Sequence, residues 1–331
     1  MRFLISRTDK IGDVVLTLPI AGWLKEKYPG CSVYFLGRTY TKSVIEASQN
    51  IDGFLNWDEL SKSKQALSTV KSYDFDTVFH VFPSKEIAFL CKEAGISRRI
   101  GTSHRWYHWL TCTKKVHFSR KKSSLHESQL NFRLLGLEEP QLPQIADLPR
   151  FYGMKPKATL APQLQRLLSP DKLNIILHPK SKGSAREWSL ENFKTLIKLS
   201  EGRFQFFITG GPDEAEELRE WSRDLHDVFF LAGTLRLEDF IPFIGACDGL
   251  IAASTGPLHL AASLGIHALG IFPPIKPMDP SRWSPIGEKA SFQVAAKSCS
   301  DCLRRTSCAC MDLVTPVSVY EALLHWKKTD R

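Results

Sequence analysis

The sequence lacks the short motifs that identify the commonest nucleotide-binding enzymes. It contains no G-x-G-x-x-G segment and no G-K-[ST] segment, so it has neither the dinucleotide-binding fingerprint nor a P-loop. These absences weigh against a dehydrogenase and a kinase. A secretory signal is also missing, because Asp9 and Lys10 precede the apolar segment 11–24 and Asp13 interrupts it. We therefore expect a cytoplasmic protein.

Acidic residues are absent between Arg98 and His126, a window that holds eight Lys and Arg residues. The formal net charge of the chain is +9, from 44 basic and 35 acidic residues. Nearly all of the excess charge therefore belongs to this window, which also contains Trp106, Tyr107 and Trp109. Its partner should be anionic: a phosphorylated substrate, an acidic membrane surface or a nucleic acid.

Charged residues are also absent from Pro257–Pro274. Because Gly265 and two histidines interrupt this segment, a helix followed by a strand fits better than a membrane span. Of the eight cysteines, Cys31, Cys91, Cys112 and Cys247 are scattered as in a reduced protein. The others form a C-x2-C-x5-C-x-C pattern, a weak zinc signal whose last spacing is short, so free thiols are favoured over a metal at Cys299, Cys302, Cys308 and Cys310.

The chain is too long for one hydrophobic core and alternates apolar strand and amphipathic helix patterns. Six prolines lie in segment 138–170, which is typical of a linker. The pattern predicts an α/β protein with two doubly wound, Rossmann-like domains facing across a cleft. The expected segments are a first domain at 1–150, a linker at 151–172, a second domain at 173–315 and a C-terminal helix at 316–331 that packs across both domains.

In the first half, the patterns predict strands at 2–6, 32–37 and 77–82 and helices at 14–27, 39–48, 84–94 and 126–136. In the second half, they predict strands at 174–178, 204–209, 228–231, 250–253 and 268–272. The helices expected there are 190–200, 213–225, 237–246 and 258–264.

Residues 249–265 carry the clearest functional signal. An apolar strand leads into Ser254, Thr255, Gly256 and Pro257, and a helix follows. Hydroxyl groups, a glycine and unpaired helix N–H groups make a cradle for an anion, toward which His259 could point. An ordinary capped strand–turn–helix is the alternative.

Further polar loops follow other predicted strands. Asp13 lies at the start of a helix, where a carboxylate is either a plain N-cap or a general base that faces the cleft. Segment 178–188 offers hydroxyls and cations for a diphosphate, or is a solvated basic loop. Segment 209–214 places Asp213 and Glu214 to bind ribose hydroxyls or to complement a helix dipole.

Together these segments resemble glycosyltransferase family 9, the bacterial heptosyltransferases of lipopolysaccharide core assembly, which have the GT-B fold. The resemblance spans nearly the whole chain. It rests on RTDKIGDVVLTLP at 7–19, HESQLNFRLLGL at 126–137, HPKSKGSAREWSLENF at 178–193, TGGPDEAEEL at 209–218 and STGPLHLAASLG at 254–265.

The resemblance implies transfer of a sugar from a nucleotide-activated donor, typically ADP-heptose, to a core-sugar hydroxyl. Asp13 matches the catalytic base. The implied donor-binding residues are Ser181, Lys182, Arg186, Glu214, Ser254, Thr255, Gly256 and His259. Two of them depart from the family pattern: Arg186 stands where the family has Lys, and Ser254 replaces the usual Asp, so the sequence leaves the donor sugar open.

We expect an inverting transferase without a metal ion or another cofactor, because cations and helix N–H groups can stabilise the leaving diphosphate. The resemblance also implies that 1–150 is an acceptor-binding domain and 173–315 a nucleotide-sugar-binding domain. Because the family's acceptor binds in the first domain, an anionic glycolipid acceptor is expected on the basic window, at Arg105, Lys114, Lys115, Arg120, Lys121 and Lys122. We expect a monomer peripheral to the inner membrane that binds no nucleic acid. The alternatives are a GT-B sugar-nucleotide epimerase and a non-catalytic protein that binds a nucleotide sugar or nucleic acid.

Overall fold

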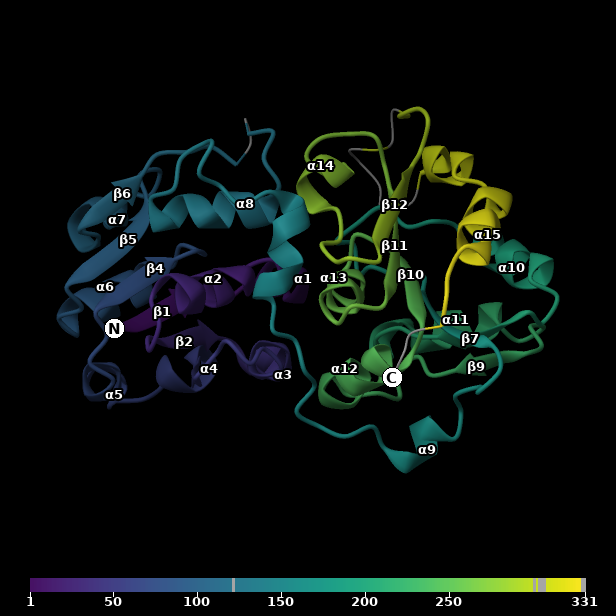
Figure 1. The fold of residues 1–331 in the computed structure, drawn as a ribbon, viewed down its shortest axis with the longest axis horizontal. Helices are drawn as coiled ribbons and strands as arrows, with labels where there is room; N and C mark the ends of the chain where they lie inside the picture. Colours follow the sequence, from purple (N-terminus) through teal and green to yellow (C-terminus); the bar gives the residue numbers. More distant parts are fainter. Residues whose placement is uncertain (121–122, 300–301, 303–307, 329–331) are drawn as a thin grey trace. The chain divides into compact units, whose positions relative to one another are not determined.

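The computed structural model describes residues 1–120, 123–299, 302 and 308–328. The chain divides into two compact units, Met1–Lys155 and Pro156–Arg331 (Figure 1). The expected boundaries at residues 150, 172 and 315 stay a prediction.

The first unit is built on a six-stranded parallel sheet of order β3-β2-β1-β4-β5-β6. This is the strand order of a dinucleotide-binding Rossmann domain, in which the direction of winding reverses between the first and fourth strands. The strands are β1 (Arg2–Ser6), β2 (Ser32–Gly37), β3 (Gly53–Asn56), β4 (Thr77–His80), β5 (Arg98–Thr102) and β6 (Lys114–Val116). In the register, Leu4 lies between Tyr34 and Val78.

Short helices connect these strands (Figure 1). They are α1 (Ile11–Val15), α2 (Pro19–Lys27), η1 (Thr39–Thr41), α3 (Lys42–Glu46), α4 (Trp57–Leu60), α5 (Ala66–Ser72), α6 (Lys85–Glu93), α7 (Trp106–Thr111), α8 (Glu127–Phe132), η2 (Arg133–Leu135) and η3 (Ile145–Phe151). The helix predicted at 14–27 is two helices, because Pro19 starts α2 and cannot continue α1. The basic window, predicted without strands, contains β5 and β6.

The second unit repeats the architecture with a parallel sheet of order β12-β11-β10-β7-β8-β9. Counted from β7, this is the same Rossmann order, with its switch point between β7 and β10. The strands are β7 (Leu173–His178), β8 (Phe204–Ile208), β9 (Val228–Phe230), β10 (Gly249–Ala253), β11 (His267–Phe272) and β12 (Ala290–Val294). The prediction of two doubly wound α/β units is confirmed, although β3 and β12 were not predicted.

The helical segments of the second unit are α9 (Pro162–Gln165), α10 (Leu190–Leu199), η4 (Pro212–Glu214), α11 (Ala215–Trp221), α12 (Leu237–Ala246), α13 (Gly256–Ser263), α14 (Pro280–Trp283), η6 (Ala309–Leu313) and α15 (Pro316–Leu324). The last helix, α15, packs against α10 (Figure 1). Its Val319 and Leu323 join a core cluster with Trp188, Phe193 and Met311.

The proline-rich segment is partly ordered against the first unit, since η3 packs on α2. This contact is tight at Gly22, where an added Cβ would lie 2.2 Å from the carbonyl oxygen of Phe151. The side chain of Asn50 lies at the same contact. Its Nδ2 is 2.8 Å from the position of the added Cβ of residue 22 and donates a 2.8 Å hydrogen bond to the carbonyl oxygen of Phe151.

We predict that Gly22→Ala lowers the melting temperature by several degrees, because the clash with backbone costs about 2 kcal/mol. Gly245→Ala in α12 is the matched control, since its Cβ would meet only Pro156 at 3.7 Å. That variant should be neutral or stabilising, because alanine has the higher helix propensity. Equal thermal unfolding curves for the two variants would contradict the packing described.

Candidate active site

Asp13 lies in the first turn of α1, seven residues after the end of β1, beside the buried guanidinium of Arg7. Arg7 follows β1 directly, and its side chain is only 4% exposed. Its guanidinium contacts Asp13 through Nη2 and donates hydrogen bonds to Asp9, 2.8 Å from Nε to Oδ1, and to Asn131, 3.1 Å from Nη1 to Oδ1. Glu127 completes the group at 3.3 Å from Nη1. Such a buried cation has to be paired, so the side chains around it are fixed in place.

Burial raises the pKa of Asp13 to about 6. The Arg7 cation works against this shift, while the charges of Asp9 and Glu127 add to it and that of Arg120 lowers it. Burial alone would lower the pKa of Arg7, but the neighbouring carboxylates raise it overall. Asp13 is therefore a carboxylate that changes its charge close to neutral pH, as a general base requires.

Helix α8 supplies two of the side chains that contact Arg7. Glu127 and Asn131 lie four residues apart, on one face of the helix, and Asn131 Nδ2 also donates to Thr17 Oγ1 and to the Leu16 carbonyl, each at 3.2 Å. Sequence reasoning named neither residue as a site residue. The HESQLNF segment quoted for the family resemblance, with two polar residues at helical spacing, was the available signal.

Arg120 also belongs to the group around Arg7. Its guanidinium contacts Glu127 and donates to Asn131 Oδ1 at 3.3 Å. The sequence prediction placed Arg120 with the surface cations of the acceptor window. The structure joins it instead to the carboxylates next to Asp13; whether it also touches an acceptor stays a prediction.

The rest of the basic window presents aromatic rings beside cations. Trp106 and Trp109 of α7 are 62% and 63% exposed. Lys115 on β6 lies over the ring of Trp109, 5.1 Å from its centroid, and Lys85 of α6 lies over Trp106 at 5.2 Å. Two further predicted acceptor residues, Arg105 and Lys114, are exposed at the start of α7 and on β6. Lys121 and Lys122 lie outside the described residues.

In the second unit, the predicted donor loops follow β7 and β10, which are neighbours at the switch point of the sheet. In open parallel sheets, ligands bind at the carboxyl ends of the strands beside such a switch point. Helix α13 begins at Gly256 with Pro257 in its first turn, and its N-cap residue Thr255 makes no side-chain capping hydrogen bond. The first N–H groups of α13 therefore have no such cap.

Thr255 has a buried hydroxyl whose Oγ1 has no hydrogen-bond partner among the described residues. A buried polar atom without a partner is costly, and a bound ligand would relieve that cost. His259, one turn into α13, is buried on the same helix, while Ser254 is half-buried.

The loop after β7 is braced by acidic side chains. Ser181 donates from Oγ to Glu187 Oε1 at 2.9 Å and to the Ala185 carbonyl at 3.1 Å. Lys182 is exposed, adopts a positive φ of 48° and pairs with Asp213 at 2.7 Å. The sequence did not single out Glu187, although it lies within the quoted loop.

Glu214 links this loop to the one after β8. Its carboxylate accepts the backbone N–H of Gly211 at 2.8 Å and that of Lys182 at 3.2 Å. The structure thus brings the predicted phosphate and ribose loops together. The role of Glu214 in binding ribose stays a prediction.

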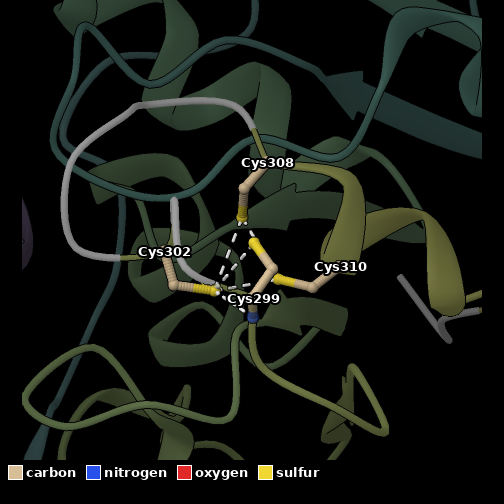
Figure 2. Close-up of side chains that lie close together, drawn as sticks. All are labelled: Cys299, Cys302, Cys308 and Cys310. Atoms are coloured by element: carbon tan, nitrogen blue, oxygen red, sulfur yellow. Dashed lines mark hydrogen bonds between the residues drawn. The ribbon is translucent and has the colours of Figure 1, made fainter.

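Arg186 is buried at the end of the same loop and donates from Nε to the carbonyl oxygen of Cys302 at 2.6 Å. Cys302 is one of the four cysteines of the weak zinc pattern, and these four do come together, with their sulfur atoms all within 4.8 Å of one another (Figure 2). Among the helices that the structure describes, none is both long enough and apolar enough to span a membrane.

Comparisons with known proteins agree with this arrangement. The chain is 28% identical over 303 residues to a Haemophilus influenzae protein named "Putative glycosyltransferase", covering 87% of this chain and 86% of that one. It is 24% identical to lipooligosaccharide heptosyltransferase 2 of Campylobacter jejuni, with 92% and 91% covered. The solved structure of Escherichia coli ADP-heptose lipopolysaccharide heptosyltransferase II has a TM-score of 0.75 at 18% identity, with 98% of both chains covered.

The shared architecture is the GT-B fold of two Rossmann-like domains, as expected from the sequence. The family model described as glycosyltransferase family 9 (heptosyltransferase) matches residues 64–311, more than half of the chain. The chain therefore belongs to glycosyltransferase family 9 and is a glycosyltransferase.

Proposed function

We propose that this protein is an inverting heptosyltransferase that moves heptose from ADP-heptose onto a sugar hydroxyl of a lipopolysaccharide core or related glycolipid, with Asp13 as general base and without a metal ion. The observation that carries the proposal is the pairing of Asp13 with buried Arg7 and the raised pKa of this carboxylate. The choice of donor and acceptor rests on the family description and on the names of the relatives.

The proposed reaction is a single displacement. The acceptor hydroxyl oxygen attacks the anomeric carbon and Asp13 takes the hydroxyl proton. The bond from the anomeric carbon to the diphosphate oxygen breaks, and ADP leaves with the electron pair. Attack opposite to the leaving group inverts the configuration. Arg7 holds Asp13 in place and stabilises its charged form before proton transfer.

The reaction also requires that the negative charge on the departing diphosphate be stabilised. The uncapped N–H groups of α13, the Arg186 guanidinium and the Lys182 ammonium are suited to bind the diphosphate of the donor. The hydroxyl of Thr255, which has no hydrogen-bond partner within the described ranges, supplies a further donor to an oxygen of this ligand.

The acceptor surface is proposed on the first unit, at Arg105, Lys114 and Lys115 with the exposed rings of Trp106 and Trp109. Cations beside exposed indole rings suit an anionic glycolipid at a membrane surface, because tryptophan favours the interface and lysine the phosphate groups. On this basis we propose peripheral contact of the first unit with the inner membrane.

Asp13→Asn should reduce turnover at least about a hundredfold, because the amide keeps the shape of the carboxylate but cannot accept the proton. Binding of ADP should be unchanged, since the donor residues lie in the other unit. Asp9→Asn is the control: it removes a carboxylate from Arg7 at 2.8 Å without removing the base, and a loss of only a few-fold is expected. Turnover of Asp13→Asn close to wild type would overturn the base assignment.

The pH dependence of kcat/KM tests the same group differently. Since the base must be ionised and its pKa lies near 6, kcat/KM should be constant above about pH 7 and fall about tenfold per pH unit well below 6. Arg7 lowers the pKa of Asp13, so Arg7→Lys, with its looser pairing, should move this limb to higher pH. A profile that stays flat down to pH 4.5 would exclude Asp13 as the titrating base.

Thr255→Val separates ligand binding from stability. The substitution removes a hydroxyl that has no partner among the described residues, so the melting temperature should not fall, whereas the affinity for ADP should fall about tenfold. Thr111→Val is matched: it removes a buried hydroxyl that donates to the Tyr107 carbonyl at 2.8 Å, and should lower stability without changing ADP affinity. Calorimetry and thermal unfolding measure both; unchanged ADP affinity in Thr255→Val would contradict the donor site.

A further inference from the structure

The segment between β12 and α15 brings four cysteines to one point (Figure 2). Cys302 and Cys310 are buried, and Cys299 and Cys308 are half-buried. The sulfur of Cys302 lies 3.6 Å from that of Cys299, 3.7 Å from that of Cys308 and 3.0 Å from that of Cys310, and the Cys308 and Cys310 sulfurs are 3.2 Å apart.

These distances match a shared metal ion better than disulfides. A disulfide joins two sulfurs at about 2 Å, and none of the eight cysteines, all of which the structure describes, forms one. Four thiolates around zinc at about 2.3 Å form a tetrahedron whose sulfurs lie about 3.8 Å apart. One sulfur within 3.7 Å of three others, in a set that all lies within 4.8 Å, is a single group of four and not two separate pairs, and its spacings lie on both sides of the zinc value.

The surroundings suit a structural site. The backbone N–H of Cys299 points to the Cys302 sulfur, 3.4 Å away, a contact that stabilises a thiolate. Cys310 and Met311 belong to the core cluster that also contains Trp188 and Val314. A closed set of four sulfur ligands in such a core leaves no position for substrate, as in structural zinc sites.

We propose that Cys299, Cys302, Cys308 and Cys310 bind one Zn²⁺ ion. We propose also that this ion fixes the position of Cys302, whose carbonyl group accepts a hydrogen bond from Arg186. The second part rests on the proposed function. Arg186 Nε donates to the Cys302 carbonyl at 2.6 Å, and Trp188, two residues on, donates from Nε1 to the Val314 carbonyl at 2.8 Å. The carbonyl groups of Cys302 and Val314 thus hold the end of the proposed phosphate loop through two buried hydrogen bonds. Tetrahedral sulfur coordination is also compatible with iron, which the test below separates from zinc.

Elemental analysis of the full chain, purified without chelator and with a thiol-free reductant, should find one zinc per chain. Cys302→Ser and Cys310→Ser should lose it. Cys31→Ser should retain it: Cys31 is buried in the first unit, and a serine hydroxyl can keep its contact with the Leu24 carbonyl. Because the ligand variants could unfold, the wild-type protein is also stripped of metal and titrated with Co²⁺, which should give the visible bands of a tetrahedral cobalt thiolate at one equivalent.

Iron at one per chain would retain the site but overturn the assignment of zinc. The site itself would be overturned by either of two results. One is the absence of both a bound metal and a cobalt spectrum, and the other is a disulfide between any of the four cysteines in the protein as purified.

The link to Arg186 has its own readout. Removing the metal should weaken ADP binding about tenfold, as expected when a buried charged group loses its support, and zinc should restore it. Unchanged ADP affinity in the metal-free protein would refute the link and leave the metal site intact. A wild-type protein that binds zinc but no ADP would instead contradict the proposed donor.

Discussion

A buried guanidinium that must be paired determines the arrangement of the first unit's site. Arg7 is 4% exposed and Glu127 is 1% exposed, so neither charge is solvated and both must be paired. Arg7 contacts Asp9, Asp13 and Glu127, and Glu127 contacts Arg120 as well. The two residues come from opposite ends of the first unit's sequence, one directly after β1 and one on α8. Their pairing therefore ties the strand end to this helix. Asp13, in the first turn of α1, contacts Arg7 and so belongs to the same charge group.

The charge group explains the raised pKa of Asp13. Burial favours the neutral form of Asp13 and Arg7 favours the ionised form; because burial prevails only in part, the carboxylate titrates near 6. A fully exposed carboxylate would be too weakly basic, and one buried without a cation would stay protonated at neutral pH. The arrangement thus gives a base that is ionised at neutral pH yet still able to accept a proton.

Much of the fold could be predicted from the sequence, because strands of parallel sheets are continuous apolar runs. The strands β1, β2, β7, β10 and β11 are buried almost throughout, and their patterns are clear. The strands β5 and β6 were missed because each begins with two basic residues, Arg98 and Arg99 in β5 and Lys114 and Lys115 in β6. Pairing with a neighbour, rather than hydrophobic pattern, makes them strands. The break between α1 and α2 depended on Pro19, which was visible but was read as part of one helix.

Strand-end reasoning selects candidate residues that follow a strand, and it does not select residues on the face of a later helix. Asp13, Lys182 and Thr255 each follow a predicted strand and were selected in this way, and their roles stay predictions. Glu127 could be recognised only once the chain was folded, because it contacts Arg7 across 120 residues of sequence. Arg120 was assigned to the acceptor surface by its neighbours in sequence. In the structure its side chain is 26% exposed and contacts Glu127, a partner that its place in the basic window did not indicate.

The four cysteines between β12 and α15 also show what sequence spacing alone does not predict. The spacing of Cys308 and Cys310 is too short for the usual zinc knuckle, and spacing alone favoured free thiols. In the structure, Cys308 is extended with φ of −152° and immediately precedes η6, which carries Cys310. In a continuous strand, side chains two positions apart share a face but start about 7 Å apart, and in a helix they point to different faces. An extended residue followed by a tight turn brings them closer, and the sulfurs of Cys308 and Cys310 lie 3.2 Å apart. The usual zinc spacings are thus tied to particular backbone turns, and this turn brings the four sulfurs together at a different spacing; metal binding by them stays a proposal.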